Sequence, residues 1–235
     1  MCIRDSTYAF DVNQRAGLSF FHPHPDMATS SQVAFGLAGG FLIRDAEEAS
    51  LGLPSGRFEV PLVVRDANYD RTGNLAYNGT ASGFTGKSLL VNGVQDPYLA
   101  TSPAVHRLRV VGGWNSRVFA LSLSNGTPLT VIGNDGGLLP APATETAVVL
   151  SPGERLDLLV DLSGSGGTSV SLLDRNSGWN LLEFRVDNSA PQGSMPTGTL
   201  STIEPLGNPA RTRTFSFDGM TRINGRAFEL NRGVR

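Results

Sequence analysis

Residues 105–111 read V-H-R-L-R-V-V, a stretch in which apolar and polar positions alternate and β-branched residues recur. Side chains of a strand point alternately to its two faces, so this alternation predicts a β-strand with one apolar face. Residues 119–123 show the same alternation and are followed by Asn125-Gly126, a dipeptide typical of tight turns between strands. The centre of the chain is therefore predicted to consist of short strands joined by turns.

Several further segments are short, apolar or alternating, and bounded by turn-forming residues. They are 8–12, 18–24, 38–44, 58–64, 89–91, 129–132, 147–150, 156–162, 170–173 and 181–186. The 28 glycines and 14 prolines suit frequent turns, and no segment has the sustained apolar period of a long helix. The pattern predicts an all-β fold, and more closely an antiparallel β-sandwich.

Composition excludes several classes of partner. The 235 residues carry a formal net charge of −2 and no basic stripe, so nucleic acid is not expected as a partner. No apolar run approaches the roughly 18 residues of a membrane span, so none is expected. The single cysteine, Cys2, lies in residues 1–6, which resemble a translated sequencing adapter and are set aside. Without them the chain has no disulfide and no thiolate ligand.

Two polar segments predict domain boundaries. Residues 46–56 form a polar connector, and residues 188–208, rich in Pro, Ser, Gly and Thr, indicate a linker. One complete domain is therefore expected between two partial ones, with both ends of the chain cut. The expected division is an adapter-derived segment at 1–6, the end of a first domain at 7–50, a complete second domain at 51–190, and a linker with the start of a third at 191–235.

The clearest chemical signal is F-H-P-H at residues 21–24, which follows the apolar run 18–21. On an extended strand, residues two apart share a face and start roughly 6.6 Å apart, so the rings of His22 and His24 can each hold one ion of a close metal pair. Neutral imidazole suits copper, zinc, iron and nickel. The alternative is an ordinary exposed turn, because Pro23 lacks a backbone donor and favours a strand edge or end.

Several stretches, in their order along the chain, resemble the three-domain multicopper oxidase family, and within it the branch of bacterial laccases, spore-coat oxidases and bilirubin oxidases. The F-H-P-H and the following Q-V-A-F-G-L-A-G are similar to the copper motif of that family's first domain. Four later stretches are similar to its middle domain and to the opening of its third. They are V-N-G at 91–93, I-G-N-D-G-G-L-L at 132–139, S-P-G-E-R-L-D-L-L-V-D at 151–161 and I-N-G-R-A-F at 223–228.

The resemblance implies a cupredoxin-like, Greek-key β-sandwich repeated three times and a laccase-like oxidase. Such an enzyme oxidises phenolic or similar small reducing substrates, or metal ions, and reduces O₂ to water. It implies that His22 and His24 each supply a ligand to one copper of the coupled pair in a three-copper cluster, with a mononuclear copper in the missing third domain. Since the family's other histidine and cysteine motifs lie outside this chain, the fragment alone is expected to be inactive.

A second hypothesis is a copper-free cupredoxin-repeat scaffold of the kind that acts in bacterial cell division; the paired histidines argue against it. A two-domain copper nitrite reductase is disfavoured because the middle unit lacks ligands. The compartment cannot be read from the sequence, although the resemblance implies a periplasmic, extracellular or spore-coat protein.

The remaining polar residues of note are expected to be structural. His106 should be a core histidine. Asp26 should be a solvated loop carboxylate, and its alternative role is to accept a hydrogen bond from a ligand imidazole. Asp135 should be part of a tight turn, and its alternative role is to face the substrate between domains. Glu154, Arg155 and Asp157 are expected to form a surface pairing, which contributes only about 0–1 kcal/mol.

Overall fold

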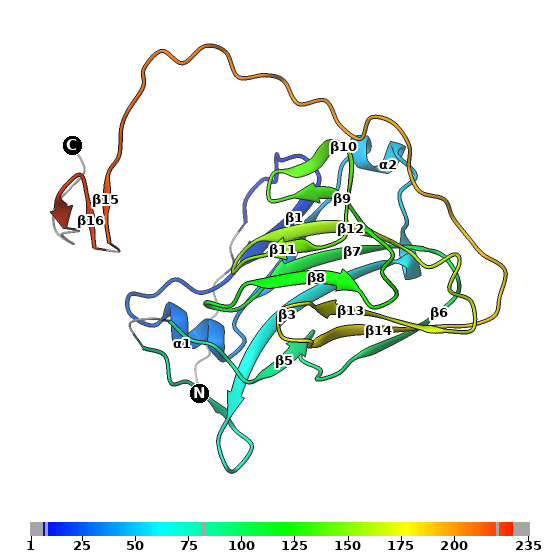
Figure 1. Ribbon diagram of the computed structural model, residues 1–235. Coiled ribbons are helices and arrows are strands. Elements are labelled where there is room, and N and C mark those ends of the chain that lie inside the picture. Colours follow the sequence, from blue (N-terminus) through cyan, green and yellow to red (C-terminus); the bar gives the residue numbers. More distant parts are fainter. Residues whose placement is uncertain (1–6, 8, 81–82, 220, 228–235) are drawn as a thin grey trace. The chain divides into compact units, whose positions relative to one another are not determined.

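The computed structural model describes residues 7, 9–80, 83–219 and 221–227. These form two compact units, Met1–Thr202 and Ile203–Arg235. The larger unit is built on two stacked β-sheets (Figure 1). The smaller contains a three-stranded sheet of β15 (Phe217–Asp218), β16 (Arg222–Ile223) and β17 (Arg226–Ala227). Among the described residues, no helix is long and apolar enough to cross a bilayer.

The larger sheet of the sandwich has seven strands. Its order is β10 (Gly137–Glu145), β9 (Leu129–Asn134), β12 (Arg155–Asp161), β7 (Val105–Gly112), β3 (Glu59–Tyr69) and β4 (Leu75–Ala76), with β5 (Ser88–Val91) also paired to β3. The facing sheet has five, in the order β11 (Val148–Leu150), β8 (Phe119–Leu123), β13 (Ser169–Asp174), β14 (Asn180–Val186) and β6 (Tyr98–Thr101).

The β-sandwich prediction is confirmed, with differences in detail. Two strand pairs, β3 with β7 and β6 with β14, are parallel rather than antiparallel. β10 was not predicted from sequence because it contains Pro140 and Pro142, which suit only the edge position that it occupies. A strand expected over residues 8–12 is wrong for its described part, since residues 9–12 are not in a strand and residue 8 lies outside the described residues.

Alternating residues of both sheets fill the space between them. Leu108 and Val110 of β7 are fully buried there with Phe119 and Leu121 of β8 and Phe184 of β14. These are the apolar positions that the alternation in the sequence singled out. Burying a large side chain of this kind contributes roughly 1.5–3 kcal/mol, so this interface supplies most of the stability of the sandwich.

The opposite face of the larger sheet is also covered, which is why every residue of β7 is buried. The cover consists of β1 (Gly17–Phe21), β2 (Gly39–Ile43) and the connector that begins with α2 (Ala46–Ser50) and ends at the short helical turn Gly56–Phe58. A second, smaller apolar cluster beneath this cover includes Leu53 of the connector, Ile132 and Leu200.

A buried ionic cluster lies under the connector. Four of its members lie on one face of three adjacent strands: Glu59 of β3, Arg107 and Arg109 of β7, and Asp157 of β12. The fifth, Glu48 of α2, contacts both arginines from the connector. Arg107 binds Asp157 through two hydrogen bonds of 2.9 and 2.6 Å and Glu48 at 2.6 Å. Arg109 donates to Glu59 at 3.0 Å, to Asp157 at 2.9 Å and to Glu48.

The predicted surface pairing of Glu154, Arg155 and Asp157 is therefore wrong. Asp157 is only 5% exposed and pairs with the two arginines of β7. Arg155 pairs with Asp135, and Glu154 accepts a hydrogen bond from the backbone of Ser151. The alternation of strand residues explains the difference, because Arg155 and Asp157 share the covered face of a sheet whose two faces are both packed.

Replacing Arg109 with methionine is expected to destabilise the protein by about 3–5 kcal/mol, because Glu48, Glu59 and Asp157 would lose a buried counter-charge. The matched control is Arg185→Met, which removes an exposed pair with Glu183 and should have a much smaller effect on the free energy of unfolding. Urea denaturation measures both, and equal effects of the two substitutions would contradict a stabilising role of the cluster.

Acid is expected to weaken the same cluster. Burial acts to raise the pKa of Glu59, but hydrogen bonds from Arg44 and Arg109 outweigh it and hold the pKa below its ordinary value. A carboxyl with a lowered folded-state pKa stabilises the fold above its unfolded pKa of about 4.3, and this contribution is lost as pH falls further. Stability measured by denaturation from pH 6 to 3 should fall less steeply for Glu59→Gln than for the unchanged chain.

Candidate metal centre

The two histidines of the F-H-P-H segment lie just beyond the end of a strand. β1 pairs antiparallel with β2 from Gly17 opposite Ile43 to Phe21 opposite Gly39. His22 and His24 follow the last paired residue, so the strand predicted through residue 24 is shorter than expected. Pro23, which has no backbone N–H, cannot continue the hydrogen-bonded ladder.

The two imidazole rings are neighbours. Their centroids are 5.2 Å apart with an angle of 37° between the ring planes. The ring of Phe20 stacks on His22 at 5.0 Å, which supports that ring from the strand side. His22 is half-buried and His24 is exposed, so both are accessible to an ion from solvent.

One hydrogen bond orients the first ring. Nδ1 of His22 lies 2.9 Å from the carbonyl oxygen of Pro23. Because a carbonyl only accepts, Nδ1 carries the proton in this bond and the lone pair of the neutral ring is on Nε2. This is the arrangement in which a metal-binding histidine is usually found, with one nitrogen fixed by the protein and the other free.

The strand that precedes the histidines, β1, is fixed to the larger sheet. Leu18 of β1 is buried, and its carbonyl accepts a 3.2 Å hydrogen bond from Nε of Arg155. The ring of Phe20 lies against Gly153, where any side chain would meet it. Gly39 of β2 faces Phe21, and a Cβ there would lie 2.6 Å from the Phe21 ring. β1 and β2 therefore fit together closely, and Arg155 joins them to β12.

The segment after the histidines is anchored as well. Helix α1 (Thr29–Ala34) is held through Ser30, whose Oγ accepts a 2.8 Å hydrogen bond from the hydroxyl of Tyr77. The backbone oxygen of Ser30 accepts another, at 3.1 Å, from Asn115. The loop with the two imidazoles is thus fixed at both ends to the same sandwich.

Other residues noted in the sequence do not join the histidines. Asp26 is exposed in the turn that follows them. His106 is fully buried in β7, with Nε2 2.7 Å from Oγ1 of Thr101 and Nδ1 3.0 Å from the oxygen of Ala104. Asp135 accepts a 2.7 Å hydrogen bond from the backbone N–H of Arg155. In the described part of the chain, no group of three or more His, Cys, Asp or Glu side chains is placed to hold a metal.

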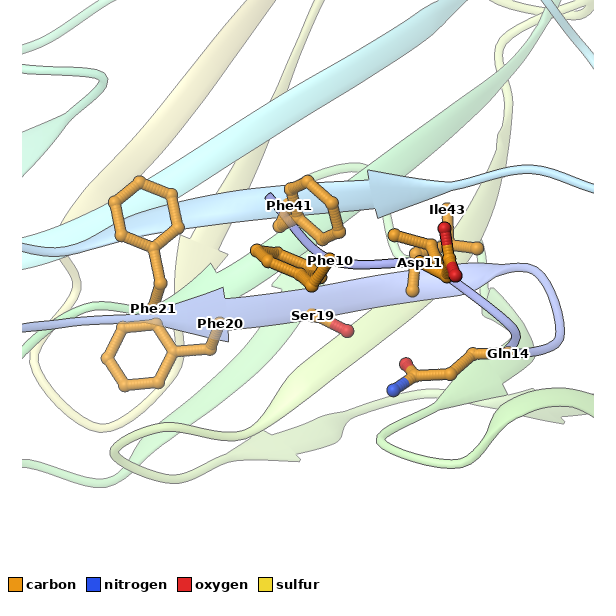
Figure 2. A pocket seen from close by; sticks show the side chains of 9 residues that line it. Phe10, Asp11, Gln14, Ser19, Phe20, Phe21, Phe41 and Ile43 are labelled. Atoms are coloured by element: carbon orange, nitrogen blue, oxygen red, sulfur yellow. The ribbon is translucent and has the colours of Figure 1, made fainter. Parts of the chain in front are cut away.

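An apolar pocket of about 380 Å³ borders β1, the strand that precedes the histidines (Figure 2). It was not predicted from the sequence. Phe10 lies over the paired strands next to Phe41, and Phe20 and Phe21 lie at the end nearest the histidines. Phe10 and Phe21 are 74% and 60% exposed. The alternation of β1 contained the signal, since Ser19 and Phe21 point away from the face that buries Leu18.

The sequence and the architecture resemble those of known proteins. A family model described as multicopper oxidase matches residues 3–48, which include both histidines. A laccase from Pediococcus acidilactici has a TM-score of 0.85 and 32% identity, covering 95% of this chain and 50% of that one. The McoA multicopper oxidase from Aquifex aeolicus has a TM-score of 0.83 and 32% identity, covering 92% and 52%.

The curated relatives have a different name. Cell division protein FtsP from Escherichia coli (strain K12) is 36% identical over 242 residues, which covers 94% of this chain and 52% of that protein. FtsP from Sodalis glossinidius is 34% identical over 243 residues, covering 94% and 51%. The chain spans about half the length of the curated relatives it matches.

The two stacked sheets and the similarity to these solved structures define a cupredoxin-like β-sandwich protein. Residues 3–48 match the multicopper oxidase family model, and the fold is similar to solved multicopper oxidases over most of this chain. The similar proteins carry two kinds of name, an oxidase and a cell division protein.

The buried histidine is expected to titrate below the ordinary imidazole value. Burial lowers the pKa of His106, the hydrogen bond to Ala104 opposes this, and the charge of Arg57 lowers the pKa further. NMR titration of its ring protons should therefore give a midpoint below about 6.5. A midpoint at or above that value would show that the ring is not in the buried, neutral state described here.

Proposed function

We propose that the chain is part of a copper-dependent oxidase in which His22 and His24 each give one imidazole to a copper pair. The observation that carries the proposal is the 5.2 Å separation of two accessible rings whose strand and helix are both fixed to the sandwich. Imidazole nitrogen is a ligand that copper prefers, so the two imidazoles present fit the metal.

The roles of the chain's own residues follow from these contacts. Pro23 holds the proton of His22 on Nδ1, which leaves Nε2 as the ligand atom. Phe20 limits rotation of that ring, and Arg155 fixes the strand from which it extends. Copper, when bound, would supply one-electron transfer from a small reducing substrate to O₂. Since the described residues supply two imidazoles and no third ligand beside them, the chain alone is expected to have no oxidase activity.

The substrate and the compartment belong to the same proposal. By family, the intact protein would oxidise phenolic or similar substrates, or metal ions, with O₂ as the acceptor and water as the product. It would be laccase-like and work in the periplasm, outside the cell or on a spore coat. The Pediococcus laccase among the similar structures supports this reading of the fold.

A copper-free role in cell division is the second candidate. The names of the 34–36% identical relatives favour it. The two candidates differ in one property that is measurable on this chain: the first requires the paired imidazoles to bind copper, and the second does not.

Copper(II) titration of the chain tests the proposal, with Cys2→Ser in every protein to remove the only thiol. Paramagnetic broadening of histidine ring protons should appear first at His22 and His24. His22→Ala and His24→Ala should each weaken binding at least tenfold, because each removes one of two ligands. The matched control is His106→Gln, which should leave copper binding unchanged.

Unchanged copper binding in both alanine variants would contradict the copper-site assignment and favour the cell-division role. In the full-length parent, either alanine substitution is expected to abolish O₂ reduction while the blue absorption of a separate mononuclear copper remains.

A further inference from the structure

A second cavity, of about 360 Å³, is lined by residues that follow helix α1 in the sequence, whereas the two histidines precede that helix. Phe35, Gly36 and Ala38, which follow α1, form one wall, and Val63 and Arg65 of β3 form another. The turn Asn92-Gly93 and Gly113 complete it. The proposed copper site has no residue in common with this cavity.

Arg65 is the charged group of this cavity, and its charge is not matched. Nη1 donates one long hydrogen bond, 3.4 Å, to the backbone oxygen of Ala34 at the end of α1. A guanidinium has five N–H donors, so most of its hydrogen-bonding capacity is unused. The adjacent carboxylate, Asp66, lies on the other face of the strand, where it binds Arg117 and the backbone N–H of Gly86.

Among the described residues, every other arginine or lysine that is buried or half-buried has a carboxylate partner. Arg107 and Arg109 share three, Arg117 has Asp66, and Arg155 has Asp135. Arg65 is half-buried and has none among the described residues. Burial accordingly lowers the pKa of Arg65, an effect that the more distant Tyr69 and Asp66 oppose.

The backbone beside the guanidinium is shaped to admit it. Gly36 has a φ of +94°, and a Cβ at that position would lie 2.2 Å from Nη1 of Arg65. Any other residue would therefore displace the guanidinium from its place at the wall of the cavity. The fold thus positions the guanidinium of Arg65, and its unused N–H donors are available to the cavity.

We propose that this cavity binds a small organic carboxylate. The carboxylate would pair with the free N–H groups of Arg65, because a guanidinium matches two carboxylate oxygens in a bidentate geometry. Its apolar part would lie against Phe35, Ala38 and Val63, which line the same cavity. The volume falls in the usual range for small-molecule sites, and a single cation beside the apolar side chains of Phe35, Ala38 and Val63 suits a carboxylate on an apolar body better than a phosphate.

Titration of benzoate into the chain, followed by NMR, tests the proposal. Saturable shifts are expected for the backbone amides of Gly93 and Gly113, with a dissociation constant on the order of 1 mM. Arg65→Gln should weaken binding at least tenfold, and Arg65→Lys should give an intermediate loss because it keeps charge without the fork. Arg71→Gln is the matched control, an exposed arginine beyond the same strand, and should have no effect.

Three further ligands separate the contribution of the charge from that of the aromatic ring. These titrations use the unchanged chain. Benzyl alcohol, which has the ring without the charge, and acetate, which has the charge without the ring, should both bind at least tenfold more weakly than benzoate. Inorganic phosphate should also bind more weakly. If Arg65→Gln fails to fold by circular dichroism, the ligand series on the unchanged chain still decides.

Three results would overturn the proposal. They are the absence of saturable shifts at these amides, benzoate binding that is equal in the Arg65→Gln and unchanged chains, and binding of phosphate as tight as that of benzoate. None of these results bears on copper binding by His22 and His24, so the two proposals succeed or fail separately.

Discussion

The organisation of the larger unit depends on the buried ionic cluster around Arg107 and Arg109. Two guanidinium groups and three carboxylates are removed from water between the sheet and the connector, and each is stable there only because the others are present. The cluster therefore fixes α2 to β3, β7 and β12. Asp45, which caps α2, also accepts a hydrogen bond from the backbone of Ala16, so the start of β1 is fixed by the same arrangement.

The position of the paired imidazoles follows from that arrangement. Three contacts fix β1: the bond from the backbone of Ala16 to Asp45, the bond from Arg155 to the carbonyl of Leu18, and the pairing with β2. The rings lie just beyond the end of this strand, where Pro23 prevents further pairing. Helix α1 and its bond from Tyr77 fix the chain again a few residues later. The local geometry around His22 and His24 thus depends on the surface of the sandwich as much as on their own strand.

The sequence predicts the sandwich well because period-two alternation is a local property, and residues 105–111 and 119–123 form buried strands as expected. It also identifies the two histidines as one cluster, since residues two apart are close in any extended chain. It fails where partners are distant: nothing near Asp157 signals that Glu48 and two arginines surround it. Arg65 was missed for a related reason, because its adjacent Asp66 suggests a pairing that strand geometry forbids.

The parallel pairing of β3 and β7 has a kinetic consequence. A turn cannot join these strands, and Arg109 meets Glu48 across 61 positions of sequence. Contacts between such distant segments form only after much of the chain is already ordered, so folding should be slow for a chain of this size. Charge contacts that form so late act mainly on the rate of unfolding. We therefore expect the cluster to slow unfolding rather than to speed folding.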